Sequence, residues 1–278
     1  MQAERRTVMT SQALISDGPV LLDIDERGIA RIRLNRPEAS NGMDVPLLRA
    51  LYDALMVAHG LPNLRVLVIS GEGPNFCAGG DVKDFASKGE DLPNYLREAT
   101  SWLQICVQAM LGLEAPVIAS VHGFAAGGGG FGLVCAADIV IAGTSAKFLA
   151  GATRVGMVPD AGTSVTLPQL VGMRKALQIV LTNPVITAPE ALAMGLITTV
   201  VADDQLAVET AAVAETLADG APQALANAKR MLWAGLGSRV EAQLPEEART
   251  VSALSGTADA REGLAAVIER RPPVFTGK

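Results

Sequence analysis

The chain has 278 residues, of which 49% are hydrophobic, 19% charged and 4% aromatic, and its formal net charge is −6. This balance excludes an intrinsically disordered chain, and the length is sufficient to bury a substantial core. Lys and Arg are spread along the chain without a basic run, which argues against nucleic acid as a partner. The three cysteines, Cys77, Cys106 and Cys135, lack the spacing of a disulfide framework or a zinc site, so we expect buried thiols in a reducing compartment.

No stretch of the sequence predicts a membrane span. The longest uncharged stretch, 115–137, contains six glycines, a proline and a histidine, which would make a poor lipid-facing helix. The N-terminus has no apolar run of signal-peptide length. We therefore expect a cytoplasmic α/β protein.

The first part of the chain predicts two strands, a helix and a third strand. Residues 1–18 are mostly polar and aperiodic, and we interpret them as a loose leader. Val20–Asp25 and Ile29–Leu34 are β-rich runs around a glycine turn, which predicts a hairpin. Apolar residues recur at helical spacing from Val45 to about His59, and a buried strand is predicted at 65–70.

A second unit repeats this plan, and a helical tail follows it. Helical spacing of apolar residues predicts a helix from 92 to 113. The apolar stretch 131–137 predicts a buried helix, preceded by a run of glycines. The expected strands of this part are 116–121, 139–142, 147–149 and 197–201, and the expected helices of the tail are 205–217, 223–233, 240–254 and 258–268. We expect a core at 19–202 and a helical C-terminal region at 203–278.

Two glycine-rich turns, each placed after a predicted strand, are the first candidates for chemistry. The first is 75–81, which contains Gly79 and Gly80, and the second is 127–130, which consists of four glycines. Glycine lets the backbone approach a ligand closely, and free N–H groups at the start of a helix favour negative charge. Two such turns could aim two N–H groups at one oxygen, as in an oxyanion hole. Two tight turns in a packed fold are an equally good interpretation of the pattern alone.

Four motifs together resemble the crotonase (enoyl-CoA hydratase/isomerase) superfamily. They are 34–39 (Leu-Asn-Arg-Pro-Glu-Ala), 76–81 (Phe-Cys-Ala-Gly-Gly-Asp), the stretch 123–138, and 187–191 (Thr-Ala-Pro-Glu-Ala) with Gly-Leu-Ile at 195–197. The resemblance covers nearly the whole chain after residue 18. It implies an α/β crotonase fold, a spiral of ββα units whose helical C-terminal part builds homotrimers, often paired into hexamers. It also implies an acyl-CoA thioester as substrate.

The resemblance assigns the thioester oxygen to the N–H groups of Gly80 and of one glycine in the second turn. The stretch 123–138 is one residue longer than the family pattern, so counting back from Asp138 selects Gly129 and counting forward from Gly123 selects Gly128. We prefer Gly129 as the catalytic donor and expect Gly128 and Ala78 to contact substrate. Lys83 is a candidate for the CoA phosphates, although a solvated surface lysine explains it equally well.

The two glutamates that hydratases of this family use to add water are missing. The first falls at Phe131 or Gly132 and the second at Ala152. Asp160 stands eight residues beyond Ala152, in a segment that resembles 1,2-epoxyphenylacetyl-CoA isomerase-like members, where an acidic residue occupies this place. One carboxylate suits isomerisation, since it takes a proton from one carbon and returns it to another. The structural alternative is that Asp160 caps the following helix.

The sequence thus predicts an acyl-CoA isomerase that acts on an enoyl-CoA or a ring-epoxide acyl-CoA. Asp160 is the expected proton shuttle, and the oxyanion hole holds the enolate. No metal or other cofactor is expected, because the substrate carries its own coenzyme A. The alternatives are a hydratase with atypical catalytic residues and a non-catalytic acyl-CoA-binding protein of the same fold.

Overall fold

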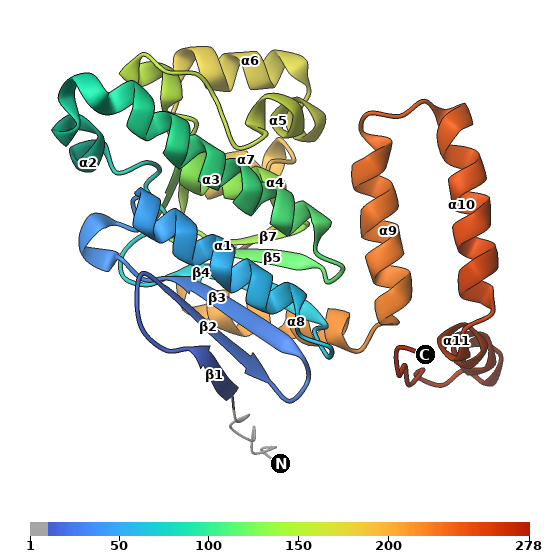
Figure 1. Cartoon of the computed structure of the whole chain (residues 1–278). Coiled ribbons are helices and arrows are strands. Elements are labelled where there is room, and N and C mark those ends of the chain that lie inside the picture. Colours follow the sequence, from blue (N-terminus) through green and yellow to red (C-terminus); the bar gives the residue numbers. More distant parts are fainter. Residues whose placement is uncertain (1–10) are drawn as a thin grey trace.

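The computed structural model describes residues 11–278, which form a main sheet, a small second sheet and eleven α-helices (Figure 1). The main sheet has seven strands, and the strands after the N-terminal meander run parallel, as expected of an α/β protein. In spatial order they are β1 (Ser11–Ile15), β2 (Val20–Asp25), β3 (Ile29–Leu34), β4 (Val66–Gly71), β5 (Val117–Val121), β7 (Ile139–Gly143) and β10 (Thr199–Val201). The second sheet contains β6 (Phe124–Ala126), β8 (Lys147–Leu149) and β9 (Ile186–Thr187).

The first strand corrects the prediction of a loose leader. Residues 11–15 pair antiparallel with β2, with Ser11 opposite Asp25 and an irregular register between Ala13 and Ile15. The strand is an edge strand and three of its five residues are exposed, so it lacks the apolar alternation that would have revealed it. The leader interpretation of residues 1–10 lies outside the described residues.

Helices cover both faces of the main sheet. Alternate residues of β4 show this, because Leu67 and Ile69 belong to the large core cluster, whereas Val66 and Val68 pack in a second cluster with α8. Helices α1 and α3 lie together on the face shown in front in Figure 1, with α8 on the other side of the sheet. The bounds of the α-helices are α1 (Val45–His59), α2 (Val82–Ser87), α3 (Leu92–Gly112), α4 (Gly127–Ala136), α5 (Thr163–Val171), α6 (Met173–Thr182), α7 (Ala188–Ala193), α8 (Leu206–Ala218), α9 (Pro222–Gly235), α10 (Val240–Ser255) and α11 (Ala258–Glu269).

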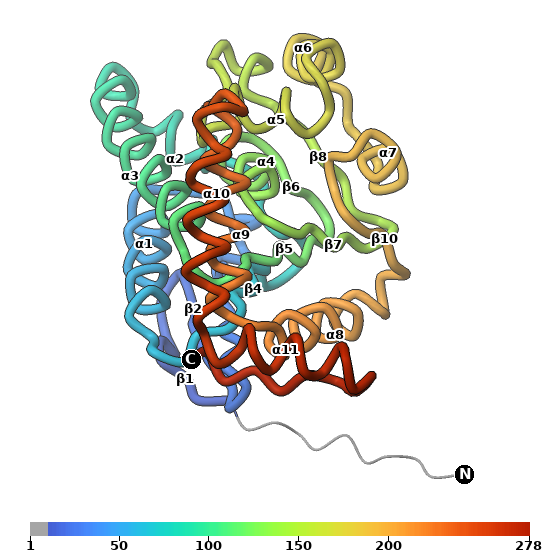
Figure 2. Tube along the Cα trace, turned by 90° about the vertical axis from the view of Figure 1, so that its right-hand side faces the viewer, coloured from blue at the N-terminus to red at the C-terminus, as the bar shows by residue number. Residues whose placement is uncertain are grey.

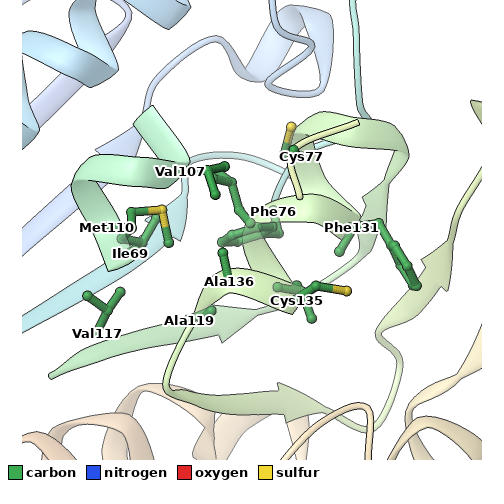
Figure 3. Close-up of a cluster of buried hydrophobic side chains, with 14 of the residues drawn as sticks. Ile69, Phe76, Cys77, Val107, Met110, Val117, Ala119, Phe131, Cys135 and Ala136 are labelled. Carbon is green, nitrogen blue, oxygen red and sulfur yellow. The ribbon is translucent and has the colours of Figure 1, made fainter. Parts of the chain in front are cut away.

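Helix α4 runs through the large core cluster. Figure 3 shows Phe131, Cys135 and Ala136 of this helix near Phe76 and near side chains of the neighbouring strands and α3. The helix begins at Gly127, four residues before the predicted start, because the glycine run itself is helical. This early start places the glycines in its first turn, beside the turn that follows β4.

The C-terminal part is helical as predicted, but its first helix belongs to the core. Leu206, Ala214 and Ala218 of α8 are buried against the main sheet, so the separate arm begins with α9 rather than at residue 203. Helices α9 to α11 stand apart from the body in Figure 1, where α9 and α10 lie side by side, and in the turned view of Figure 2 helix α10 lies in front of α9. Lys229 of α9 joins the arm to the body. Its Nζ lies 2.9 Å from the Asp138 carboxylate and donates hydrogen bonds to the carbonyls of Met110 and Ala115.

Candidate active site

The fold brings the two glycine-rich turns into direct contact. A parallel bridge joins Cys77 to Ala125, in which the Cys77 N–H donates to Phe124 and the Ala126 N–H donates to the Cys77 carbonyl. Gly79 and Gly127 both have positive φ, and a Cβ on Gly79 would lie 3.3 Å from the Gly127 Cα. Only glycine permits this conformation and this approach at both places. The two turns therefore lie against each other at one place in the fold.

Unpaired N–H groups gather where the turns meet. Among residues 11–278 the Gly80 N–H has no hydrogen-bond acceptor. Gly128 and Gly129 lie in the first turn of α4, where N–H groups have no acceptor within the helix. Both residues and Gly80 line the same cavity, so the backbone of the two turns borders a common space. Of the two, Gly128 is half-buried and Gly129 is buried, and both border the cavity.

The cavity has a volume of about 790 Å³ and is predominantly apolar. It lies between α3, the two glycine turns and the segment 149–160, and Ala78, the predicted substrate contact, is part of its wall. In the described part of the chain its charged lining residues are Asp160 and Arg154 alone. Besides Ala78, the apolar side chains that line it are Met43, Leu48, Val82, Phe85, Ala86, Leu92, Leu96, Ala99, Leu103, Ala126, Leu149, Ala152, Val155, Met157 and Val158.

Asp160 lies beside the second glycine turn, and its carboxylate occupies the space that a side chain at residue 128 would need. A Cβ on Gly128 would lie 2.5 Å from the Asp160 Cγ. Burial raises the pKa of this carboxyl above its ordinary value, and a hydrogen bond from its own N–H lowers it by less. The helix-cap interpretation is wrong, because Gly162 is the N-cap of α5 and no side chain caps that helix. The carboxylate is therefore free to act on a ligand.

No second carboxylate reaches the cavity from the positions that hydratases use. Phe131 is 1% exposed and packs in the core, away from the cavity. A Cβ on Gly132 would lie 2.5 Å from the Ala161 Cβ, so the turn after Asp160 fills the space of any longer side chain there. Ala152 does line the cavity but carries no acid. Within the part of the chain that the structure describes, Asp160 is thus the one carboxylate that lines the cavity.

Lys83 and Arg154 show where sequence reasoning was incomplete. Lys83 is exposed on α2 and does not line the cavity, so the structure gives it no contact with the other site residues. Arg154, which the sequence analysis did not consider, lines the cavity and donates to the Asn183 carbonyl at 2.6 Å. The sequence did contain a signal for Arg154, because it stands two residues after Ala152, a position already expected in the site.

Arg36 links the motif at 34–39 to the first glycine turn, 75–81. Its guanidinium lies 3.0 Å from Asp44 and 3.1 Å from Asp81. These two aspartates are the N-caps of α1 and α2, where they accept from the Leu47 and Asp84 N–H groups. One half-buried cation thus fixes the start of α2, directly after Gly80.

The fold and the site together define a crotonase-fold protein: a spiral α/β core with paired glycine turns at one end of a deep apolar cavity. The chain belongs to the enoyl-CoA hydratase/isomerase family, whose sequence model matches residues 25–278. It is 42% identical over 251 residues to a Rhodobacter capsulatus protein named "Probable enoyl-CoA hydratase", which covers 90% of this chain and 95% of that one.

Two further relatives carry different functional names, one an isomerase and the other a hydratase. The chain is 32% identical over 255 residues to the 1,2-epoxyphenylacetyl-CoA isomerase of Escherichia coli K12, covering 91% of this chain and 97% of the isomerase. It also resembles the crystal structure of an enoyl-CoA hydratase from Bacillus anthracis, with a TM-score of 0.88 and 31% identity over 94% of this chain and all of that one. The family is therefore established, whereas the names of the relatives do not separate hydratase from isomerase. None of the helices within residues 11–278 has the length and apolarity to cross a membrane.

Proposed function

We propose that this protein isomerises an enoyl-CoA or a ring-epoxide acyl-CoA thioester, with Asp160 as the single proton shuttle. The observation that carries the proposal is the position of Asp160, the one carboxylate among the described cavity residues, next to the unpaired N–H groups of the two glycine turns. A hydratase of this family needs two carboxylates to position and activate water. One carboxylate is sufficient for moving a proton between two carbons.

The chemistry follows from this arrangement for a 3-enoyl-CoA substrate. The thioester oxygen accepts hydrogen bonds from Gly80 and from the first turn of α4, at Gly129 or its neighbour Gly128. Asp160 removes a proton from C2, and the electron pair moves toward the thioester oxygen to form a dienolate. The same carboxyl group then returns the proton to C4, so that the double bond ends between C2 and C3. Each positioned oxyanion donor is worth about 10²–10³ in rate.

Burial prepares Asp160 for both halves of this cycle. A base whose pKa is raised toward the working pH accepts a proton more readily and still releases it to the second carbon. The apolar lining excludes water that would otherwise add to the double bond or take up the proton. We assign Ala78 and Gly128 to contacts with the thioester and keep Lys83 as a candidate for the CoA phosphates. The reaction needs no metal or redox cofactor.

Assembly into homotrimers or hexamers is part of the proposal. The arm exposes large apolar side chains that a lone subunit would leave in water, among them Leu232, Leu264, Val267 and Ile268, each at least 67% exposed. Apolar surface of this extent marks an interaction site between proteins. We expect copies of the chain to cover it.

A panel of thioesters tests the proposal against its two rivals. Purified protein is incubated with 3-enoyl, 2-enoyl and aromatic CoA thioesters, and the products are identified by mass spectrometry. We expect movement of the double bond or opening of an epoxide without net addition of water. Hydroxyacyl-CoA as the main product would favour an atypical hydratase, the activity that the name of the Rhodobacter capsulatus relative describes. Tight binding without turnover would favour a non-catalytic acyl-CoA-binding protein.

A further inference from the structure

The Phe85 ring packs directly against Gly80, the expected oxyanion donor of the first turn. The three atoms nearest to a Cβ built on Gly80 all belong to the Phe85 ring, and the Cζ would be 2.5 Å away. The ring therefore lies on the face of Gly80 that a side chain would occupy. Phe85 also lines the cavity, so the same ring borders the space where the thioester oxygen would bind.

The local fold holds this ring in place. Asp81, directly after Gly80, caps α2, and its carbonyl accepts the Phe85 N–H at 2.9 Å, so one helical turn brings the ring back over Gly80. The other side of the ring meets Tyr95 of α3 edge-on, with the ring centroids 6.1 Å apart. The Tyr95 hydroxyl accepts the Val45 N–H at 3.1 Å, and the Lys88 Nζ lies 4.3 Å from the centre of the Tyr95 ring. Three helices therefore fix the position of Phe85.

We propose that Phe85 is a positioning residue that keeps water away from the Gly80 N–H and from the enolate formed beside it. This inference rests on the proposed function, since it assumes that the Gly80 N–H binds the thioester oxygen. A donor with no protein acceptor would be hydrated if the space beside it were open. Removing that water strengthens the hydrogen bond to a developing oxyanion and prevents loss of the shuttled proton to solvent.

The test follows the shuttled proton in D₂O. Isomerisation of a 3-enoyl-CoA by the wild type should return mostly protium to C4, since Asp160 is shielded between the two transfers. Phe85→Ala should increase deuterium at C4 several-fold and lower kcat by about 10-fold, less than the 10²–10³ that follows loss of an oxyanion donor. Phe85→Leu, which refills most of the space, should restore both values toward the wild type. If Phe85→Ala fails to fold, the Gly80→Ala variant carries the test, because its Cβ must displace the Phe85 ring.

Gly80→Ala provides an independent arm of the same test. Its Cβ must displace the Phe85 ring while leaving the N–H in place, so it should increase deuterium uptake as Phe85→Ala does. The double variant should take up no more than Phe85→Ala alone, because the two changes act on one contact. Phe275→Leu, the same kind of change on the C-terminal tail, should behave as the wild type. Wild-type deuterium uptake in Phe85→Ala would overturn the inference.

A second measurement separates this inference from the proposed function. Exchange of the C2 protons of saturated hexanoyl-CoA with D₂O needs only the oxyanion hole and the base. If the wild type exchanges these protons but isomerises no enoyl-CoA, the proposed function fails. In Phe85→Ala an about 10-fold slower deprotonation is partly offset by several-fold greater uptake of solvent deuterium, so the Phe85 inference then stands if the net exchange slows by a few-fold, and fails if the exchange rate is unchanged. If the wild type shows neither reaction, both fail.

Discussion

Replacing Asp160 with asparagine tests the catalytic role of this residue and its structural role in one variant. The change keeps the shape of the side chain but removes the group that accepts the substrate proton. Isomerisation should fall by about 10²–10⁴, the usual contribution of a positioned general base. Binding of acyl-CoA should persist, because the oxyanion donors are backbone N–H groups that the change leaves in place.

The stability of the same variant should not fall. Loss of a helix cap would cost about 1 kcal/mol, or about 2–4 °C in Tm for a chain of this size, but Asp160 caps no helix. Its pKa is raised in the folded state, so the unfolded chain loses its proton first as pH rises. The stability that the protonated form provides is present at low pH and is lost as pH rises through the folded-state pKa. At neutral pH, Asp160→Asn should therefore leave Tm unchanged or raise it.

The assays are initial rates with a 3-enoyl-CoA, thermal unfolding, and the pH dependence of kcat/KM. The wild-type profile should fall on acidification at a pH above the ordinary range of aspartate, since burial raises the pKa of Asp160. Asp203→Asn is the matched control, because Asp203 lies outside the cavity and binds the Ser145 N–H on the surface. Near-normal turnover of Asp160→Asn would remove this residue from the mechanism. A Tm loss of several degrees in Asp160→Asn would contradict the conclusion that this buried carboxyl caps no helix.

Three further predictions concern water addition, assembly and the arm. Hydration of crotonyl-CoA should be slow or absent in a direct absorbance assay, because residues 11–278 place no second carboxylate in the cavity to activate water; robust hydratase turnover would refute this. Light scattering at micromolar concentration should give a trimer or hexamer, since the arm exposes large apolar side chains; a monomer would contradict it. Lys229→Met should cost about 3 kcal/mol in urea unfolding at fixed protein concentration, because it leaves the half-buried Asp138 carboxylate without its buried cation. A cost below about 1 kcal/mol would mean that the other donors to Asp138, Val117 and Trp233, are sufficient.

Most of the fold was predictable because the strands and helices of the core have strong patterns. Val20–Asp25 and Ile29–Leu34 were located to the residue, since the glycine turn between them is unmistakable. The start of α4 was not, because four consecutive glycines have low helix propensity and only packing makes them helical. The edge strand β1 was also missed, because its pairing with β2 makes it a strand, whereas its own sequence has no strand pattern.

The site was predictable as a set of backbone turns but not as a cavity. Gly80, Gly128, Gly129 and Asp160 come together as the motifs indicated. The contact between Phe85 and Gly80 depends on the path of α2, which no spacing reveals. The role of Asp160 had two interpretations in the sequence, and geometry excludes the cap because the helix begins two residues too late.

A single turnover with a 3-enoyl-CoA deuterated at C2 tests the central claim most directly. If Asp160 alone moves the proton, the product is a 2-enoyl-CoA that carries deuterium at C4, detected by NMR after a quench. The label should not appear at C4 with Asp160→Asn. A 3-hydroxyacyl-CoA product, with oxygen from water at C3, would contradict the account.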